Sequence, residues 1–256
     1  ASDVYKRQVV ADLPEKIEDT VMAQLTGEQR KLYLANQDRI AQQVQHREAS
    51  EFKKDKLKVL AELTKLRQIC CDPRLHYEDY KAGSAKLDTC MELVHGALDG
   101  GHRILLFSQF TGMLDIIGKR LAKEDIAFLK LTGASSKESR AKMVAQFQAG
   151  EVPVFLISLK AGGVGLNLTA ADVVIHYDPW WNVAAQDQAT DRAHRIGQQH
   201  TVTVYKLIAK DTIEERIMQM QESKRDLVNS VLGGDGISSA LFTREDVLAL
   251  LGGDGR

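Results

Sequence analysis

The chain has 256 residues, of which 44% are hydrophobic and 27% are charged, so it is large enough to bury a sizeable core. No apolar run approaches the roughly 18 residues of a membrane span, and Cys70, Cys71 and Cys90 have neither zinc-ligand nor disulfide-framework spacing. A formal net charge of -1 gives no sign of nucleic-acid binding, which needs local positive charge. We therefore expect a cytoplasmic protein with no metal site and no membrane partner.

The first part of the chain, residues 1–83, is expected to precede the main domain. Residues 2–8, SDVYKRQ, look like translated sequencing-adapter sequence, with an authentic short linker as the alternative, so we predict that residues 1–8 are non-native. For residues 9–83 we predict a linking segment and a helical arm. Thr26 and Gln29 have the spacing of a capping box that opens one helix. A second helix covers residues 48–68 and ends before Pro73.

Residues 84–210 alternate between helical and strand patterns. We expect strands at residues 103–108, 128–131, 154–158, 173–177 and 202–207. We expect a first helix that carries Leu87, Met91, Val94 and Leu98 and ends at Gly100-Gly101. Further helices are expected at 113–121, from a Ser135/Glu138 capping box to Gly150, and at 182–195. The alternation predicts an α/β fold, a parallel sheet covered by helices with ligands at the carboxyl ends of its strands. Residues 211–256 are predicted to form a bracing helix, from Asp211 to Gly233, and a tail with a short amphipathic segment at 243–251.

Two arginines stand out in the stretch from Gln188 to Gln198, QATDRAHRIGQ. Arg192 and Arg195 are three residues apart on one face of the predicted helix, with Gln188 one turn earlier. The planar guanidinium binds phosphoryl oxygens and stabilises the charge that develops during phosphoryl transfer. By spacing alone, ordinary surface ion pairs are the more common interpretation.

A glycine-rich turn follows one of the buried strands, in the block FLISLKAGGVGLNLTAADVVIHYDPWWN that runs from residue 155 to 182. Gly162, Gly163 and Gly165 allow the backbone to turn tightly after the strand. No Lys-Ser or Lys-Thr pair follows these glycines, so the turn is not a phosphate-binding P-loop, and we find no acidic metal motif elsewhere in the sequence.

Together the two blocks resemble motifs six and five of superfamily-two helicases in their Swi/Snf form, and shorter segments such as Phe107–Phe110 and Leu131–Gly133 resemble further motifs in the same order. DEAD-box RNA helicases usually carry HRIGR in this motif, whereas this chain has HRIGQ, with Gln198 in place of the final arginine. The resemblance implies a RecA-like lobe of a bacterial DNA-dependent ATPase, with Leu159 and Val183 departing from the common pattern. The site residues that it implies are Arg195, Arg192 and Gln188 for catalysis, Gly163, Gly165, Asn167 and Asp191 for nucleotide binding, and Ser108, Gln109, Thr132, Ser158, Lys160, Gly162 and Trp181 for DNA binding.

The resemblance also implies a function. The chain is expected to be the second motor lobe of an ATP-dependent translocase or remodeller of double-stranded DNA, associated with the nucleoid and acting on a protein substrate on DNA. ATP and Mg²⁺ would be bound mainly by an N-terminal motor lobe that the chain lacks, so the chain alone should hydrolyse no ATP. The alternatives are a strand-separating DNA or RNA helicase lobe, and a non-catalytic interaction domain.

Overall fold

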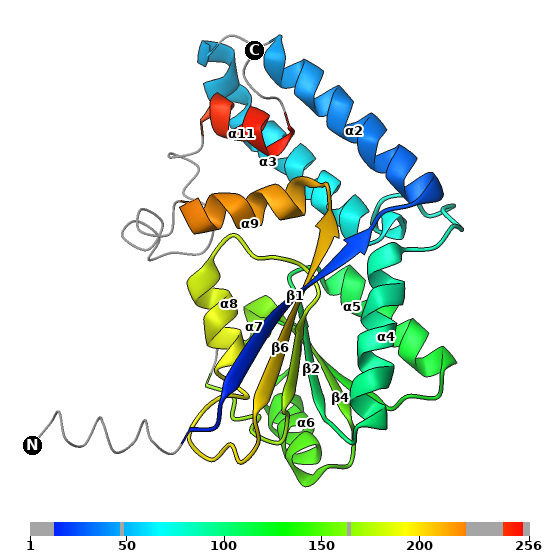
Figure 1. Ribbon diagram of the computed structural model, residues 1–256, viewed down its shortest axis with the longest axis vertical. Helices are drawn as coiled ribbons and strands as arrows, with labels where there is room; N and C mark the ends of the chain where they lie inside the picture. The colour runs from blue at the N-terminus through cyan, green and yellow to red at the C-terminus, as the bar shows by residue number, and fades with distance from the viewer. Residues whose placement is uncertain (1–12, 47–48, 163–164, 224–242, 253–256) are drawn as a thin grey trace, which may run out of the picture. The chain divides into compact units, whose positions relative to one another are not determined.

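The computed structural model describes residues 13–46, 49–162, 165–223 and 243–252, and Figure 1 shows their fold. Residues 1–8, predicted to be non-native, lie outside this part. The chain divides into two compact units. The first unit comprises the residues up to Val21, Cys90–Asp178 and Ala184–Leu207, and the second comprises Met22–Thr89, Pro179–Val183 and the residues from Ile208 onward. No helix in the described residues is long and apolar enough to cross a membrane.

The first unit contains a six-stranded sheet in the order β1-β6-β5-β2-β4-β3. Its strands are β1 (Lys16–Gln24), β2 (Ile104–Ser108), β3 (Phe128–Leu131), β4 (Val154–Ser158), β5 (Val173–His176) and β6 (Val202–Lys210). The pairs β3-β4, β4-β2, β2-β5 and β5-β6 are parallel, which confirms the predicted parallel sheet. Every residue of β2, β4 and β5 is buried, as expected for apolar strands covered on both faces.

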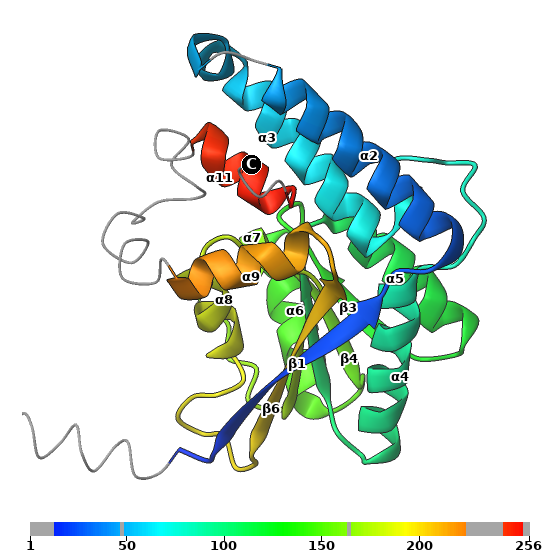
Figure 2. The same ribbon diagram turned by 45° about the horizontal axis from the view of Figure 1, so that its top comes forward.

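Helices cover both faces of this sheet, as Figures 1 and 2 show. They are α4 (Ala85–Asp99), α5 (Thr111–Lys123), α6 (Lys137–Ala149), α7 (Leu159–Gly162) and α8 (Val183–Thr190). Two predicted glycine stops are confirmed. Gly101 follows α4 with a φ of 75°, and Gly150 caps α6 in the left-handed conformation that glycine adopts at least cost.

Strand β1 was not predicted from the sequence. It is the edge strand next to β6, and seven of its nine residues are exposed, so its sequence KIEDTVMAQ carries no apolar run. Glu18 of β1 accepts a hydrogen bond from Lys206 of β6 at 2.7 Å and pairs with Lys16 at 2.8 Å. Burial raises the pKa of Glu18, but the bonds from Lys16 and Lys206 outweigh burial and bring this pKa down to about 2.

Both predicted capping boxes are wrong. The cap of α6 is Ser136, whose side chain accepts from Ser139 N, while the Ser135 hydroxyl accepts from Thr132 N. Thr26 precedes α2 but makes no side-chain cap bond. The Gln29 amide instead donates to Ile69 O at 3.0 Å, because a buried amide must find partners wherever the fold supplies them.

The second unit is built from helices that come from both halves of the chain. They are α2 (Gly27–Gln45), α3 (Ala49–Cys71), the short 3-10 helix η1 (Pro73–Leu75), α9 (Ile213–Ser223) and α11 (Arg244–Leu250). Helix α3 ends directly before Asp72-Pro73, as predicted. Leu63 and Leu66 of this helix are buried, whereas Leu57 is exposed.

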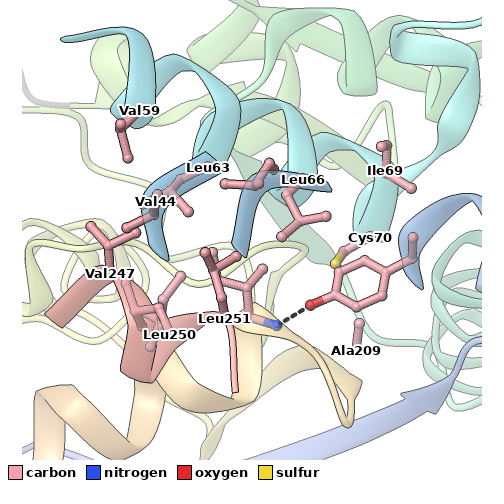
Figure 3. Packing of buried hydrophobic residues seen from close by; sticks show 14 of the residues in the cluster. Val44, Val59, Leu63, Leu66, Ile69, Cys70, Ala209, Val247, Leu250 and Leu251 are labelled. Carbon is pink, nitrogen blue, oxygen red and sulfur yellow. Dashed lines mark hydrogen bonds between the residues drawn. The ribbon is translucent and has the colours of Figure 1, made fainter. Parts of the chain in front are cut away.

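One hydrophobic cluster joins α2, α3, α9 and α11, and Figure 3 shows it from close by. Leu63 and Leu66 of α3 pack with Val247 and Leu250 of α11. The Tyr33 hydroxyl of α2 accepts a hydrogen bond from Ile213 N at the start of α9, at 2.7 Å. The cluster therefore needs residues from near both ends of the described chain.

A fully buried ion pair lies in the same unit. Lys86 Nζ, in the first turn of α4, is 3.0 and 2.8 Å from the two carboxylate oxygens of Glu214 in α9. Glu214 also accepts a hydrogen bond from Ala209 N at 2.8 Å. The pair satisfies the hydrogen-bonding groups of both side chains, which is the condition under which a buried charge pair is tolerated.

Candidate functional site

Four of the predicted site residues line one cavity at the carboxyl ends of β2, β3 and β4. Gln109, Thr132, Ser158 and Lys160 each follow or end one of these strands, and the carboxyl ends of parallel strands meet at one edge of a sheet. The cavity has a volume of about 400 Å³, and its remaining lining residues are Thr111, Asp115, Lys130, Gly133 and Ala134. Hydroxyl, amide and ammonium donors therefore converge on a space where an anionic oxygen can bind.

Two lysines and one aspartate are the charged residues of this lining. Lys130 forms an ion pair with Asp115 across the cavity wall. Lys160 lies in α7, and its side chain is exposed. The local charge is thus positive although the chain as a whole carries a formal net charge of -1.

Ser158, the last residue of β4, is 2% exposed. Its hydroxyl oxygen is a buried atom with no hydrogen-bond partner in the described part of the chain. Buried polar groups are normally paired, so an unpaired hydroxyl beside a polar cavity indicates a ligand or solvent partner. Gly162 ends α7 a few residues later, and Gly163 lies outside the described residues.

Ser108 and Gln109 both form hydrogen bonds with Asp178, a residue that was not among the predicted site residues. The Ser108 hydroxyl donates to Asp178 Oδ1 at 2.5 Å, and Gln109 Nε2 donates to Asp178 Oδ2 at 2.6 Å. Ser108 is fully buried and is not part of the cavity lining, whereas Gln109 is. Asp178 follows β5, so this carboxylate fixes the ends of β2 and β5 to each other. Its position directly after a buried strand is the sequence signal that could have identified it.

The predicted arginines lie in what we call the arginine turn, residues 191–198, which follows α8. The helix predicted to reach Arg195 ends at Thr190 instead. Arg195 and Gln188 are exposed, while Arg192 is only 8% exposed and its Nε is a buried atom without a partner in the described residues. Burial, and then the neighbouring charge of Arg195, lower the pKa of Arg192 while Asp191 raises it.

A second segment, the glycine loop of residues 165–168, packs against the arginine turn. Leu168 N donates to Arg192 O at 3.0 Å, and Arg195 Nη1 donates to Leu166 O at 3.4 Å. Gly165 has a φ of 34°, and Asn167 is exposed. The structure therefore brings Gly165, Asn167 and both arginines together, apart from the residues that line the cavity.

Trp181 belongs to the second unit and does not line the cavity. Its ring is half-buried, with the Arg67 guanidinium 5.2 Å from the ring centroid. Arg67 also donates to Pro179 O at 2.5 Å. These contacts hold the Trp180–Trp181 segment by a cation–π interaction and a backbone hydrogen bond.

Comparison with known proteins identifies the lobe. The family model for the helicase conserved C-terminal domain matches residues 85–197. A Mycoplasma pneumoniae protein named as an uncharacterized ATP-dependent helicase is 40% identical over 96% of this chain, which spans 23% of that protein. The chain spans about a quarter of the length of three curated relatives that it matches.

Solved structures show that the fold is shared as well. The SWI2/SNF2 ATPase core of Sulfolobus solfataricus in complex with double-stranded DNA is 35% identical with a TM-score of 0.78, over 96% of this chain and 52% of the other. The C-terminal domain of a SWI2/SNF2 ATPase from the same organism is 32% identical with a TM-score of 0.75, over 92% of this chain and 98% of that domain. The chain therefore belongs to the SWI2/SNF2 ATPase family, as a C-terminal helicase lobe with the RecA-like fold.

Proposed function

We propose that this chain is the second motor lobe of an ATP-dependent translocase or remodeller of double-stranded DNA. The observation that carries the DNA part is the cavity at the carboxyl ends of β2, β3 and β4, where Gln109, Thr132, Ser158 and Lys160 converge. Its donors suit the phosphates of a DNA backbone, which position a protein without reading sequence. A relative of the same fold was solved with double-stranded DNA.

The ATP part of the proposal rests on the arginine turn. Arg195 is exposed and Arg192 is beside it, while Gln188 lies exposed on α8. We assign both arginines to the phosphates of ATP held by a second lobe, with Gly163, Gly165, Asn167 and Asp191 beside the nucleotide. ATP and Mg²⁺ would be bound mainly by that N-terminal lobe, since this sequence contains no P-loop motif. We therefore expect the 256-residue chain by itself to hydrolyse no ATP.

The residues that we propose for DNA binding are supported by different observations. Lys160 and Thr132 line the cavity, and Gly162 ends the helix that carries Lys160. The Ser108 hydroxyl donates to Asp178, which also accepts from Gln109. We therefore assign Ser108 to positioning Gln109 rather than to direct contact with DNA. Trp181 stays a proposal, supported by its half-exposed ring.

The ATP proposal is tested by Arg195→Ala in the intact protein that contains this chain. We expect DNA-stimulated turnover of ATP to fall about 10³-fold or more, the usual effect of removing such an arginine, with DNA affinity almost unchanged. Arg120→Ala is the matched control, because Arg120 of α5 makes a surface ion pair with Glu124, the residue directly after that helix. Unchanged turnover in Arg195→Ala would remove Arg195 from the catalytic role.

The DNA proposal is tested by Lys160→Ala in the same protein. Loss of one phosphate contact should weaken binding to all sequences alike and lower the slope of log affinity against log salt by about one. Lys119, an exposed lysine on α5, provides the control variant. An unaltered salt slope in Lys160→Ala would contradict the contact.

Two further candidates remain to be separated from this one. A strand-separating helicase would unwind a plain duplex, whereas a translocase displaces the third strand of a triplex without unwinding. A non-catalytic interaction domain would leave the intact protein without DNA-stimulated turnover. We expect triplex displacement only, from a cytoplasmic protein that associates with the nucleoid and acts on a protein bound to DNA.

A further inference from the structure

The side chain of Gln198 is buried and bonds at both ends of its amide. Its Nε2, which carries two N–H groups, lies within hydrogen-bond distance of three carbonyl oxygens and shares its donors among them: Thr169 O at 3.1 Å, Ala171 O at 2.7 Å and Ala193 O at 3.0 Å. Its Oε1 accepts from the backbone nitrogens of Gln199 and His200, both at 2.9 Å. The residue is only 5% exposed, so these partners replace water almost completely.

The pattern of partners requires a neutral amide at this position. An amide offers two N–H groups and one carbonyl oxygen with two lone pairs, so it can serve acceptors on one side and donors on the other. A carboxylate would place negative charge against three carbonyl oxygens. An arginine would leave the nitrogens of Gln199 and His200 without an acceptor. Each replacement therefore leaves buried polar groups unpaired, which is costly.

Gln198 is also well placed to act on Arg195. Its backbone nitrogen donates to Arg195 O at 2.9 Å, which closes the arginine turn. Its side chain ties the turn, through Ala193 O, to the segment of residues 169–171 directly after the glycine loop. The glycine loop in turn accepts from Arg195 Nη1. The Gln198 side chain thus fixes the turn that carries Arg195 to residues 169–171, in addition to the backbone bond from Leu168 N to Arg192 O.

We infer that Gln198 is a positioning residue for Arg195, which holds the arginine turn against the segment that follows the glycine loop. This inference rests on the proposed function, because it gives Arg195 a catalytic task. Gln198 touches neither nucleotide nor DNA in this role. It acts by limiting where the Arg195 guanidinium can lie.

The test uses Gln198→Met in the intact protein, a change that keeps the length of the side chain and removes both its donors and its acceptor. We expect DNA-stimulated kcat to fall about 10- to 100-fold, because a displacement of about 1 Å can cost 100-fold in rate. Amide hydrogen exchange at Gln199 and His200 should become faster, because both lose their acceptor. The neighbour Gln199 is exposed, so Gln199→Met is the matched control and should leave kcat unchanged.

A second readout separates positioning from general support of the fold. In an Arg195→Ala background, single-turnover measurements should show that adding Gln198→Met lowers the residual rate less than about twofold, since nothing remains to be positioned. Equal losses in both backgrounds would overturn the inference. If Gln198→Met does not unfold cooperatively, Gln198→Asn replaces it, with an amide on a stem one methylene shorter and the same expected losses.

The outcomes also separate this inference from the proposed function. Full turnover in Arg195→Ala would defeat the proposed function itself. Loss of turnover in Arg195→Ala, together with a Gln198→Met rate within about twofold of the wild type, would defeat only the positioning role of Gln198.

Discussion

The buried pair of Lys86 and Glu214 gives a prediction about what stabilises the second unit. Lys86→Met keeps most of the side-chain volume but leaves the Glu214 carboxylate buried without its counter-charge, 2.8 Å from where the ammonium was. Removing one partner of a buried pair costs about 3–5 kcal/mol. That is a large share of the roughly 5–15 kcal/mol by which a typical domain is stable.

Urea unfolding followed by tryptophan fluorescence measures this loss. The sequence has two tryptophans, Trp180 and Trp181, and both belong to the second unit. With a slope of about 2 kcal/mol per molar urea, the midpoint should fall by roughly 2 M. Lys58→Met is the control, because Lys58 is 78% exposed and its ion pair with Asp55 contributes little.

The double variant Lys86→Met/Glu214→Gln sharpens the test. It removes both charges and keeps an oxygen that can accept from Ala209 N, so it should be more stable than Lys86→Met alone. A Lys86→Met protein that unfolds at the wild-type urea concentration would refute the reasoning. A double variant less stable than Lys86→Met would refute it as well.

Three other variants test the first unit. Gly150→Ala should destabilise it by about 1 kcal/mol or more in urea unfolding, since φ is 79° there and a Cβ would meet the Arg103 side chain; equal midpoints would contradict this. Asp178→Ala leaves the buried Ser108 hydroxyl and the partly buried Gln109 amide without their acceptor and should cost about 1–3 kcal/mol by the same measurement, and a loss below that range would argue against it. Because the pKa of Glu18 is about 2 in the folded protein, below its ordinary value of 4.5, its stabilisation is present above pH 4.5 and lost as the pH falls toward 2. The gap in stability to Glu18→Gln should therefore close over that range, and a gap that persists at pH 2 would disprove the assignment.

The central strands were predictable because burial on both faces leaves a continuous apolar run. The predicted bounds of β4 are confirmed, and those of β2 and β5 differ from the structure by one residue. The predicted bounds of β3, an edge strand, are confirmed as well. Strand β1 was missed for the opposite reason, since an exposed edge strand needs no apolar pattern. Its existence depends on pairing with β6, a partner far along the chain that no local signal reveals.

Polar side chains were harder to place, because their partners are distant in sequence. The Gln29 amide bonds across 40 residues to Ile69 O rather than to its own helix end. Ser108 was predicted for DNA from its position at a strand end, but Asp178 takes its hydroxyl. The cavity lies where three strands end, which is where the sheet pattern predicts ligands, but its residues were named from the family resemblance.

The discontinuity of the second unit has a consequence for how the chain folds during synthesis. All parts of the first unit have been synthesised once Leu207 has been made, so this unit can complete its sheet as soon as that residue has left the ribosome. Helices α2 and α3 are made first but must wait for Val247 and Leu250 before their apolar faces are covered. In that interval the apolar faces of α2 and α3 are exposed to solvent. A stall or premature stop after residue 207 should therefore favour aggregation and binding by chaperones.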